Sequence, residues 1–165
     1  MHNEYSIRLF LPEEADQYKA IRLEALALEP GNFGNSHAME AAMTDEEWLE
    51  RLTSPNMGRF GLYHNGELIG LTAIIQDKDK PEEAYMTQSY IRKEHRGKGL
   101  SKMLYEARLN WAKEHGLKYL VIGHRESNIS SKAANQKFGF RFTHKELRDW
   151  PDGAKEDMYY YTLEL

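Results

Sequence analysis

The stretch Arg96-Gly97-Lys98-Gly99 most constrains this chain, because two closely spaced glycines stand between a β-prone run and a helical pattern. The β-prone run covers residues 84–91, and the helical pattern starts at Leu100. Glycine lets the backbone take positive φ angles and approach a ligand closely. The first N–H groups of a helix lack internal partners and donate well to phosphate oxygens. The sequence therefore predicts a strand, a glycine turn and a helix whose N-terminus binds an anion.

Three basic side chains, Arg96, Lys98 and Lys102, lie around this turn. Their clustering favours phosphate contact over an ordinary solvated helix end. The turn is not a Walker P-loop, because no Gly-x-x-x-x-Gly-Lys-Ser/Thr occurs, and the pair Gly97-x-Gly99 lacks the third glycine of a Rossmann fingerprint. The turn alone leaves the identity of the anion open.

Length and composition set the broad class of the protein. With 165 residues, of which 41% are hydrophobic, we expect a single domain spanning residues 1–165 with one core. A formal net charge of -4 argues against nucleic acids or anionic membranes recognised by bulk charge. The chain has no cysteine, which excludes disulfides and a thiolate nucleophile.

Two further absences shape the expectations. No stretch reaches the roughly 18 apolar residues of a membrane span, and residues 1–5 do not resemble a signal peptide, so we expect a cytoplasmic protein. The seven histidines show no metal-ligand spacing, and we predict no metal site.

Periodicity and turn residues predict the element order β, α, α, β, β, β, α, β, α, β, β. Asn65-Gly66 predicts a tight hairpin, and Asn32 to His37 is expected to form a loop. This order indicates one mixed sheet with helices on its faces. The expected strands cover residues 5–11, 59–64, 67–75, 84–91, 119–124, 141–147 and 157–165, and the expected helices lie within 12–29, 44–53, 100–115 and 129–138.

Two features downstream of the glycine turn carry a family resemblance. Asn128 stands after a predicted strand and caps a short helix, which runs into Phe138-Gly139-Phe140. Together with the glycine turn, this arrangement resembles the GNAT superfamily of acyl-coenzyme A dependent N-acyltransferases. The resemblance implies an α/β (α+β) fold, with a mixed, mostly antiparallel sheet of about seven strands, about four flanking helices and splayed strands 4 and 5.

The resemblance also implies where acetyl-CoA would bind as co-substrate. The end of the fourth strand would bond the pantetheine arm through its backbone, and the side chain of Asn128 would contact the same arm. Amides of the glycine turn would hold the pyrophosphate, with Lys102 adding charge. The strand residues are Ser89, Tyr90 and Ile91, and the turn residues are Arg96, Gly97, Lys98, Gly99, Leu100 and Ser101.

This chain departs from the family pattern at two positions. Ser101 stands where the signature ends in glycine or alanine, and its hydroxyl could reach a phosphate. Asn135 stands seven residues after Asn128, where many relatives carry a tyrosine that protonates the departing thiolate. Asn135 could hydrogen-bond the sulfur but has no proton to give, so water or a nearby tyrosine such as Tyr90 could substitute.

The general base is expected near the end of the strand covering residues 119–124. His124 is the first candidate, since an imidazole suits removal of a proton from an ammonium near neutral pH. Glu126 could do the same through water. The alternatives are a hydrogen-bonded histidine at a strand end and a solvated loop carboxylate. A backbone N–H near Tyr90 or Ile91 would stabilise the oxyanion.

The resulting interpretation is an N-acetyltransferase that moves the acetyl group of acetyl-CoA to a primary amine of a small molecule or peptide, by direct attack. A non-catalytic acyl-CoA sensor on the same fold is an alternative, supported by Asn135 at the usual tyrosine position. A nucleotide-phosphate binder unrelated to CoA is a third. Residues 158–161, Met-Tyr-Tyr-Tyr, could place a tyrosine at the acceptor or at a homodimer partner.

Overall fold

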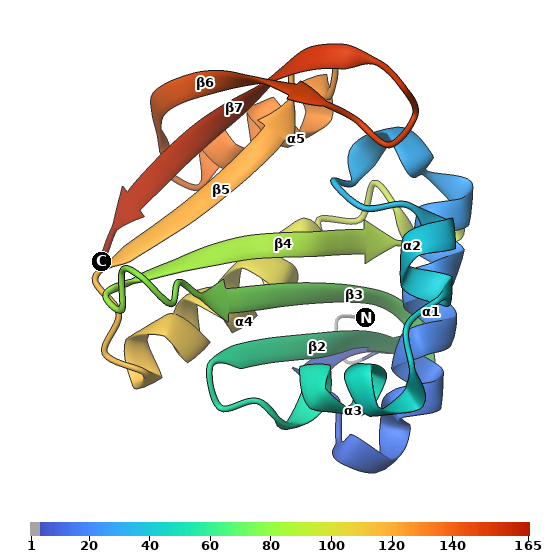
Figure 1. Ribbon diagram of the computed structural model, residues 1–165. Helices are drawn as coiled ribbons and strands as arrows, with labels where there is room; N and C mark the ends of the chain where they lie inside the picture. The colour runs from blue at the N-terminus through green and yellow to red at the C-terminus, as the bar shows by residue number, and fades with distance from the viewer. Residues whose placement is uncertain (1–3) are drawn as a thin grey trace.

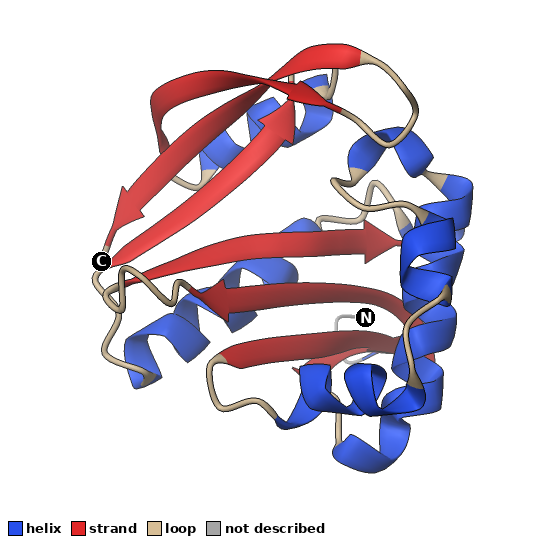
Figure 2. Ribbon diagram, viewed as in Figure 1, coloured by secondary structure: helices blue, strands red, loops and turns tan. Residues whose placement is uncertain are grey.

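A computed structural model describes residues 4–165, and these residues build a seven-stranded mixed sheet. The first three residues, which belong to the segment on which the absence of a signal peptide was argued, lie outside the described part. The strand order is β1-β2-β3-β4-β5-β7-β6 (Figures 1 and 2). The strands are β1 (Tyr5–Leu9), β2 (Met57–His64), β3 (Glu67–Gln76), β4 (Glu83–Ile91), β5 (Tyr119–Arg125), β6 (Arg141–Asp149) and β7 (Lys155–Glu164).

Helices pack on both faces of this sheet (Figure 2). On one face, Tyr18 of α1 and Trp48 of α3 share a core with Leu71 and Tyr90. On the other face, Trp111 of α4 joins a second core. The α-helices are α1 (Ala15–Leu28), α2 (His37–Ala41), α3 (Asp45–Thr53), α4 (Ser101–Glu114) and α5 (Ile129–Lys137), and three short 3-10 helices cover Pro12–Glu14, Pro30–Asn32 and Lys93–His95. Within residues 4–165, no helix has the length and apolar composition needed to cross a membrane.

The neighbouring strands β4 and β5 run parallel and then separate, as the resemblance implied. Their residue pairs run from Glu83↔Tyr119 to Met86↔Ile122, and in the part of the chain that the structure describes no pair joins them beyond that point. Figure 1 shows the two strands diverging toward their C-terminal ends. A gap therefore opens in the middle of the sheet, next to the start of α4 and α5.

The predicted order of the main elements is confirmed, and the expected loop from Asn32 to His37 is confirmed for residues 33–36. A 3-10 helix ends at Asn32, and α2, a helix that the sequence did not predict, begins at His37. Helix α2 forms because the Ser36 side chain accepts a hydrogen bond from the Met39 amide and caps its first turn. The first strand ends at Leu9 rather than at residue 11, and Phe10 turns into the core.

Candidate active site

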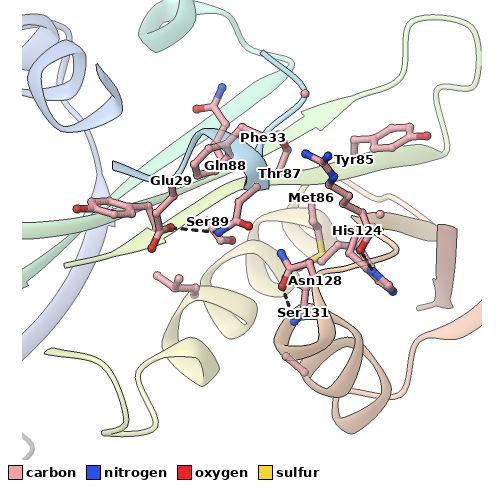
Figure 3. Close-up of a pocket in the computed structure, with 18 of the residues that line it drawn as sticks. Glu29, Phe33, Tyr85, Met86, Thr87, Gln88, Ser89, His124, Asn128 and Ser131 are labelled. Carbon is pink, nitrogen blue, oxygen red and sulfur yellow. Dashed lines mark hydrogen bonds between the residues drawn. The ribbon is translucent and has the colours of Figure 1, made fainter. Parts of the chain in front are cut away.

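A cavity of about 700 Å³ lies at the gap between β4 and β5. One half is lined by Arg96 at the start of the glycine turn and by residues of α4 and α5, and we call it the cofactor half. The other half is lined by α1, α3, β2, the segment after α1, and the ends of β5 and β6, and we call it the acceptor half. Figure 3 shows Asn128 and Ser131 at the start of α5 and Phe33 from the segment after α1, with residues of β4 between them.

The glycine turn has the geometry that the sequence predicts. Gly97 and Gly99 have φ angles of 76° and 74°, and a side chain built on either would meet no atom within 4 Å. Helix α4 begins directly afterwards, at Ser101. The turn is therefore open to a ligand on its glycine side, and its backbone conformation is one that other residues rarely adopt.

The three basic residues of the turn differ in placement. Arg96 lines the cavity, where its side chain donates to the Ile91 carbonyl and pairs with Glu29. Lys98 approaches the Tyr5 hydroxyl at 3.4 Å, and Lys102 pairs with Glu106 at 3.7 Å. Neither lysine lines the cavity, so their proposed contribution is charge near its mouth.

Helix α5 places two asparagines on the cofactor half, Asn128 at its N-cap and Asn135 in its last turn. Asn128 caps the helix, since its side chain accepts a hydrogen bond from the Ser131 amide at 3.2 Å. Asn135 is only 1% exposed, and its Oδ1 accepts a hydrogen bond from the Tyr105 hydroxyl at 2.5 Å. Its Nδ2 is buried without a hydrogen-bond partner among the described residues. An orphan buried donor is costly unless a ligand satisfies it.

Sequence reasoning missed Tyr105, which lies on α4 and lines the same cavity. Its neighbour one turn along the helix, Arg108, is fully buried, and Arg108 Nη1 has no hydrogen-bond partner within residues 4–165. Burial lowers the pKa of Arg108 to about 10. The guanidinium carbon lies 5.0 Å from the centre of the Tyr105 ring. A tyrosine hydroxyl, an orphan amide and a buried cation thus meet beside the gap. The only sequence signal was that both residues occupy the buried stripe of α4.

Tyr90 points away from this cluster. Its hydroxyl donates to Glu24 at 2.8 Å, and burial together with Glu24 raises the pKa of Tyr90 well above its usual range. Glu24 also accepts two hydrogen bonds from Arg92, so it anchors the end of β4 to α1. Ser89 faces the other way and bonds the Thr72 hydroxyl at 2.9 Å. Both tyrosines line the cavity with a hydroxyl that donates to a protein oxygen, Tyr90 to Glu24 and Tyr105 to Asn135.

The two candidate bases, His124 and Glu126, lie in different environments. His124 lines the cavity but is 4% exposed, with Nδ1 at 2.7 Å from the Arg125 carbonyl and Nε2 at 2.9 Å from the Tyr161 hydroxyl. The carbonyl can only accept, so Nδ1 carries a proton, and in the neutral ring Nε2 accepts from the Tyr161 hydroxyl. Glu126 is exposed, accepts from the Tyr159 hydroxyl at 3.2 Å and does not line the cavity. The fold brings His124 to the site and leaves Glu126 outside it.

The acceptor half is rich in arginine, which sequence reasoning also missed. Glu29 is the one carboxylate residue among the described residues that line the cavity. The arginines that line the two halves together are Arg22, Arg51, Arg59, Arg96, Arg108, Arg125 and Arg148. Arg22, Arg51, Arg96 and Arg125 form ion pairs with carboxylates. Among the described residues, Arg59, Arg108 and Arg148 form none, so the cavity is positive on balance in a protein of net charge -4.

The splayed parallel strands, the glycine turn and the cavity between them define an acyltransferase type of fold. A family model confirms this class: the acetyltransferase (GNAT) family matches residues 18–140, and the chain belongs to that family. The family uses acetyl-CoA.

The individual proteins to which this chain is similar share less than a third of its residues. A probable spermine N(1)-acetyltransferase from Bacillus subtilis subsp. natto (strain BEST195) is 28% identical over 88 residues, which cover 50% of this chain and 58% of that protein. The chain thus spans less than two thirds of that relative. A GNAT acetyltransferase from Streptococcus pneumoniae superposes with a TM-score of 0.83 at 23% identity, covering 98% and 100% of the two chains. The Salmonella typhimurium protein yncA, solved with its cofactor acetyl-CoA, reaches 0.81 at 18% identity over 99% and 95%.

The cofactor half fits acetyl-CoA by three features of this chain. The glycine turn leaves open space at a helix N-terminus, which suits a pyrophosphate. The gap between β4 and β5 suits an extended arm. The orphan Nδ2 of Asn135 and Nη1 of Arg108 supply buried donors deep in the same half.

Proposed function

We propose that this protein is an N-acetyltransferase that transfers the acetyl group of acetyl-CoA to a primary amine of a small molecule or peptide by direct attack. The observation that carries the proposal is one continuous cavity, which runs from Arg96 and Ser101, on either side of the two glycines, through the gap between β4 and β5 to a second polar half. Such a cavity suits two ligands that meet at the gap. A protein that only binds acyl-CoA has no need for the second half.

The residues proposed to hold the cofactor follow the cavity wall. The amides from Arg96 to Ser101 would bind the pyrophosphate, and the backbone of Ser89, Tyr90 and Ile91 would bond the pantetheine arm. Asn128 at the N-cap of α5 and Asn135 in its last turn would contact the arm near its thiol end. The orphan donor of Asn135 supports its place in this set.

Acetyl-CoA, when bound, supplies a thioester whose acetyl carbon the amine attacks and whose thiolate leaves. The thiolate needs a proton, and we propose that Tyr105 provides it. The Tyr105 hydroxyl is held by Asn135 Oδ1, and burial raises the pKa of Tyr105, so it is protonated at neutral pH. The nearby Arg108 cation favours the tyrosinate formed after proton transfer.

His124 is the proposed base, since it lines the cavity beside the gap. To act on a bound amine, Nε2 would have to release its hydrogen bond from Tyr161. Glu126 has no place in this proposal, because its side chain lies outside the cavity wall.

The test measures thiol release from acetyl-CoA with a panel of polyamines, aminoglycosides, amino acids and peptides. We expect release that depends on an acceptor. Tight CoA binding without turnover on any acceptor would favour the sensor alternative. Thermal stabilisation by ATP and none by CoA would favour a nucleotide-phosphate binder.

A further inference from the structure

We propose that the amine acceptor carries an anionic group, a carboxylate or a phosphate, which binds to a cluster of three arginines in the acceptor half. This inference rests on the proposed function and narrows its substrate class. The cluster consists of Arg22 from α1, Arg51 from α3 and Arg59 from β2, all of which line the cavity.

The cluster holds more positive charge than the protein neutralises. Glu40 accepts two hydrogen bonds from Arg22, at 2.9 and 2.8 Å, and one from Arg51 at 2.8 Å. Among the described residues, it is the one carboxylate paired with this cluster. Three guanidinium groups therefore share a single carboxylate, which leaves two positive charges for a ligand or solvent to balance.

Arg59 is the least compensated member. It is 4% exposed, and its polar partners are the Tyr18 hydroxyl at 2.9 Å, the Arg51 carbonyl at 2.9 Å and the Met57 sulfur. Burial and the charges of Arg51 and Arg22 lower the pKa of Arg59. A buried cation without a carboxylate is unfavourable in the free protein, and a bound anion would relieve it.

Arg22 adds a donor that is ready for a ligand. The residue is 3% exposed, and its Nη1 has no hydrogen-bond partner in the described part of the chain. Its Nε and Nη2 are both used by Glu40. Nearly every buried donor in a folded protein is paired, so this exception at a cavity wall points to a missing acceptor.

The cluster is connected to the gap between β4 and β5. The Tyr18 hydroxyl accepts from Arg59 and donates to Gln88 Oε1 at 3.0 Å. Gln88 has a φ angle of 59° and lies in β4 just beyond its last residue paired with β5, Met86. In Figure 3, Gln88 lies on β4 between Thr87 and Ser89. A ligand anion on the arginines would therefore place the amine of a short acceptor toward the gap.

The same charge has a chemical consequence. Positive groups lower the pKa of a bound ammonium, which increases the neutral fraction that attacks a thioester. They also repel polycations such as spermine. An acceptor with one amine and one anionic group gains from both effects, because the guanidinium groups hold the anion while the amine loses its proton.

The first experiment compares matched acceptors in the thiol-release assay with the unmodified protein. The pairs are phenylalanine with phenethylamine, and glucosamine 6-phosphate with glucosamine, with spermine as the polycation. We expect kcat/KM to be at least about 10-fold higher for the anionic member of one pair, since hydrogen bonds to charged groups are strong. The preferred pair distinguishes carboxylate from phosphate. Equal or faster turnover of the neutral members or of spermine would overturn the proposal.

The second experiment uses Arg59→Met, with Arg141→Met on exposed β6 as its matched control. Arg59→Met should reduce the preference for the anionic acceptor to less than about 2-fold and leave the KM for acetyl-CoA unchanged, because Arg59 lies outside the cofactor half. Arg141→Met should keep the preference. A preference retained by Arg59→Met contradicts the arginine assignment.

A binding measurement separates this inference from the proposed function. Sulfate titrated against CoA-free protein should raise the Tm of the unmodified chain and of Arg141→Met, and raise that of Arg59→Met clearly less. Sulfate stabilisation that depends on Arg59, with no acceptor turnover, would leave the anion site intact and reject the acetyltransferase. Equal sulfate effects in all three proteins would reject the anion site whatever the activity.

Discussion

The two halves of the cavity are built in different ways. The cofactor half uses short stretches of chain, in which the glycine turn runs directly into α4 and Asn128 lies seven residues before Asn135. Its ligand groups are backbone amides and small polar side chains. The acceptor half uses arginines from α1, α3, β2 and β6, which lie far apart in the sequence.

This difference matches what each half has to recognise. A pyrophosphate at a helix N-terminus needs a local backbone shape, and a local sequence specifies that shape. An acceptor needs side-chain charge at a particular place, which any element that reaches the wall can supply. Under the proposed function, the cofactor half would bind a ligand common to the family, and the acceptor half would set the choice of substrate.

The largest effect is expected from Gly99→Glu in the cofactor half. The substitution adds bulk and negative charge where the pyrophosphate would bind, and like charges in contact cost several kcal/mol, so CoA affinity should fall by at least about 100-fold. Gly66→Glu is the matched control, because Gly66 also has positive φ and open space but lies in the β2–β3 hairpin. Isothermal titration calorimetry with CoA measures the affinity of both variants. Retained affinity in Gly99→Glu would reject the turn as the phosphate site.

Tyr105→Phe should slow the acetyl-transfer step and leave the binding of acetyl-CoA unchanged. Removing a general acid lowers kcat by roughly 100-fold, whereas the KM for acetyl-CoA should change little. Tyr63→Phe is the control, because the Tyr63 hydroxyl is also buried but lies outside the cavity wall. An unchanged kcat in Tyr105→Phe would show that water or another group protonates the thiolate.

In the acceptor half, Glu40→Gln should cost stability. Glu40 is 1% exposed, and removing one partner of a buried ion pair destabilises a protein by about 3–5 kcal/mol. Glu14→Gln, which breaks the more exposed pair with Arg8, should cost less than about 1 kcal/mol. Urea unfolding measures both. Added sulfate should restore part of the loss in Glu40→Gln, and equal costs for both variants would contradict the buried cluster.

The same carboxylate should make the acceptor half sensitive to acid. Burial raises the pKa of Glu40, but the hydrogen bonds and charges of Arg22 and Arg51 outweigh it and lower this pKa from 4.5 to about 2 in the folded protein. Between these values the unfolded chain binds a proton that the folded chain does not, so the free energy of unfolding falls as the pH drops from about 4.5 toward 2. Glu40→Gln should reduce this slope. A slope identical to that of the unmodified protein would place the acid sensitivity elsewhere.

The smallest effect is expected at His124, where the two halves meet. Both ring nitrogens are engaged inside the protein, so His124→Gln should lower kcat by about 10-fold, less than a fully exposed base would. The pH dependence of kcat/KM distinguishes the two roles of His124. Loss of one limb of the profile in His124→Gln supports the base, and an unchanged profile assigns His124 to positioning the end of β5.

Much of the cofactor half was predictable because its signals are local. The strand, the glycine turn, the helix and the Asn128 cap each depend on neighbours within a few residues. The chemistry at the thiol end was not predictable, because Tyr105 and Asn135 are thirty residues apart and meet only when α4 packs against α5. For the acceptor half, the sequence contains one indication: Arg22 falls in the buried stripe of α1, beside Ile21 and Ala25. From the sequence alone, a single arginine at this position is taken as an ordinary residue of an amphipathic helix and not as part of a ligand site.

By itself, the sequence determined the order of the main elements, the glycine turn and the family resemblance, since these depend on short-range periodicity and backbone preference. Only the tertiary structure decided that Arg22, Arg51 and Arg59 share Glu40, that Tyr105 holds Asn135, and that His124 enters the site while Glu126 does not. The physical reason is that charge balance and burial are sums over neighbours in space, and these neighbours come from distant parts of the chain.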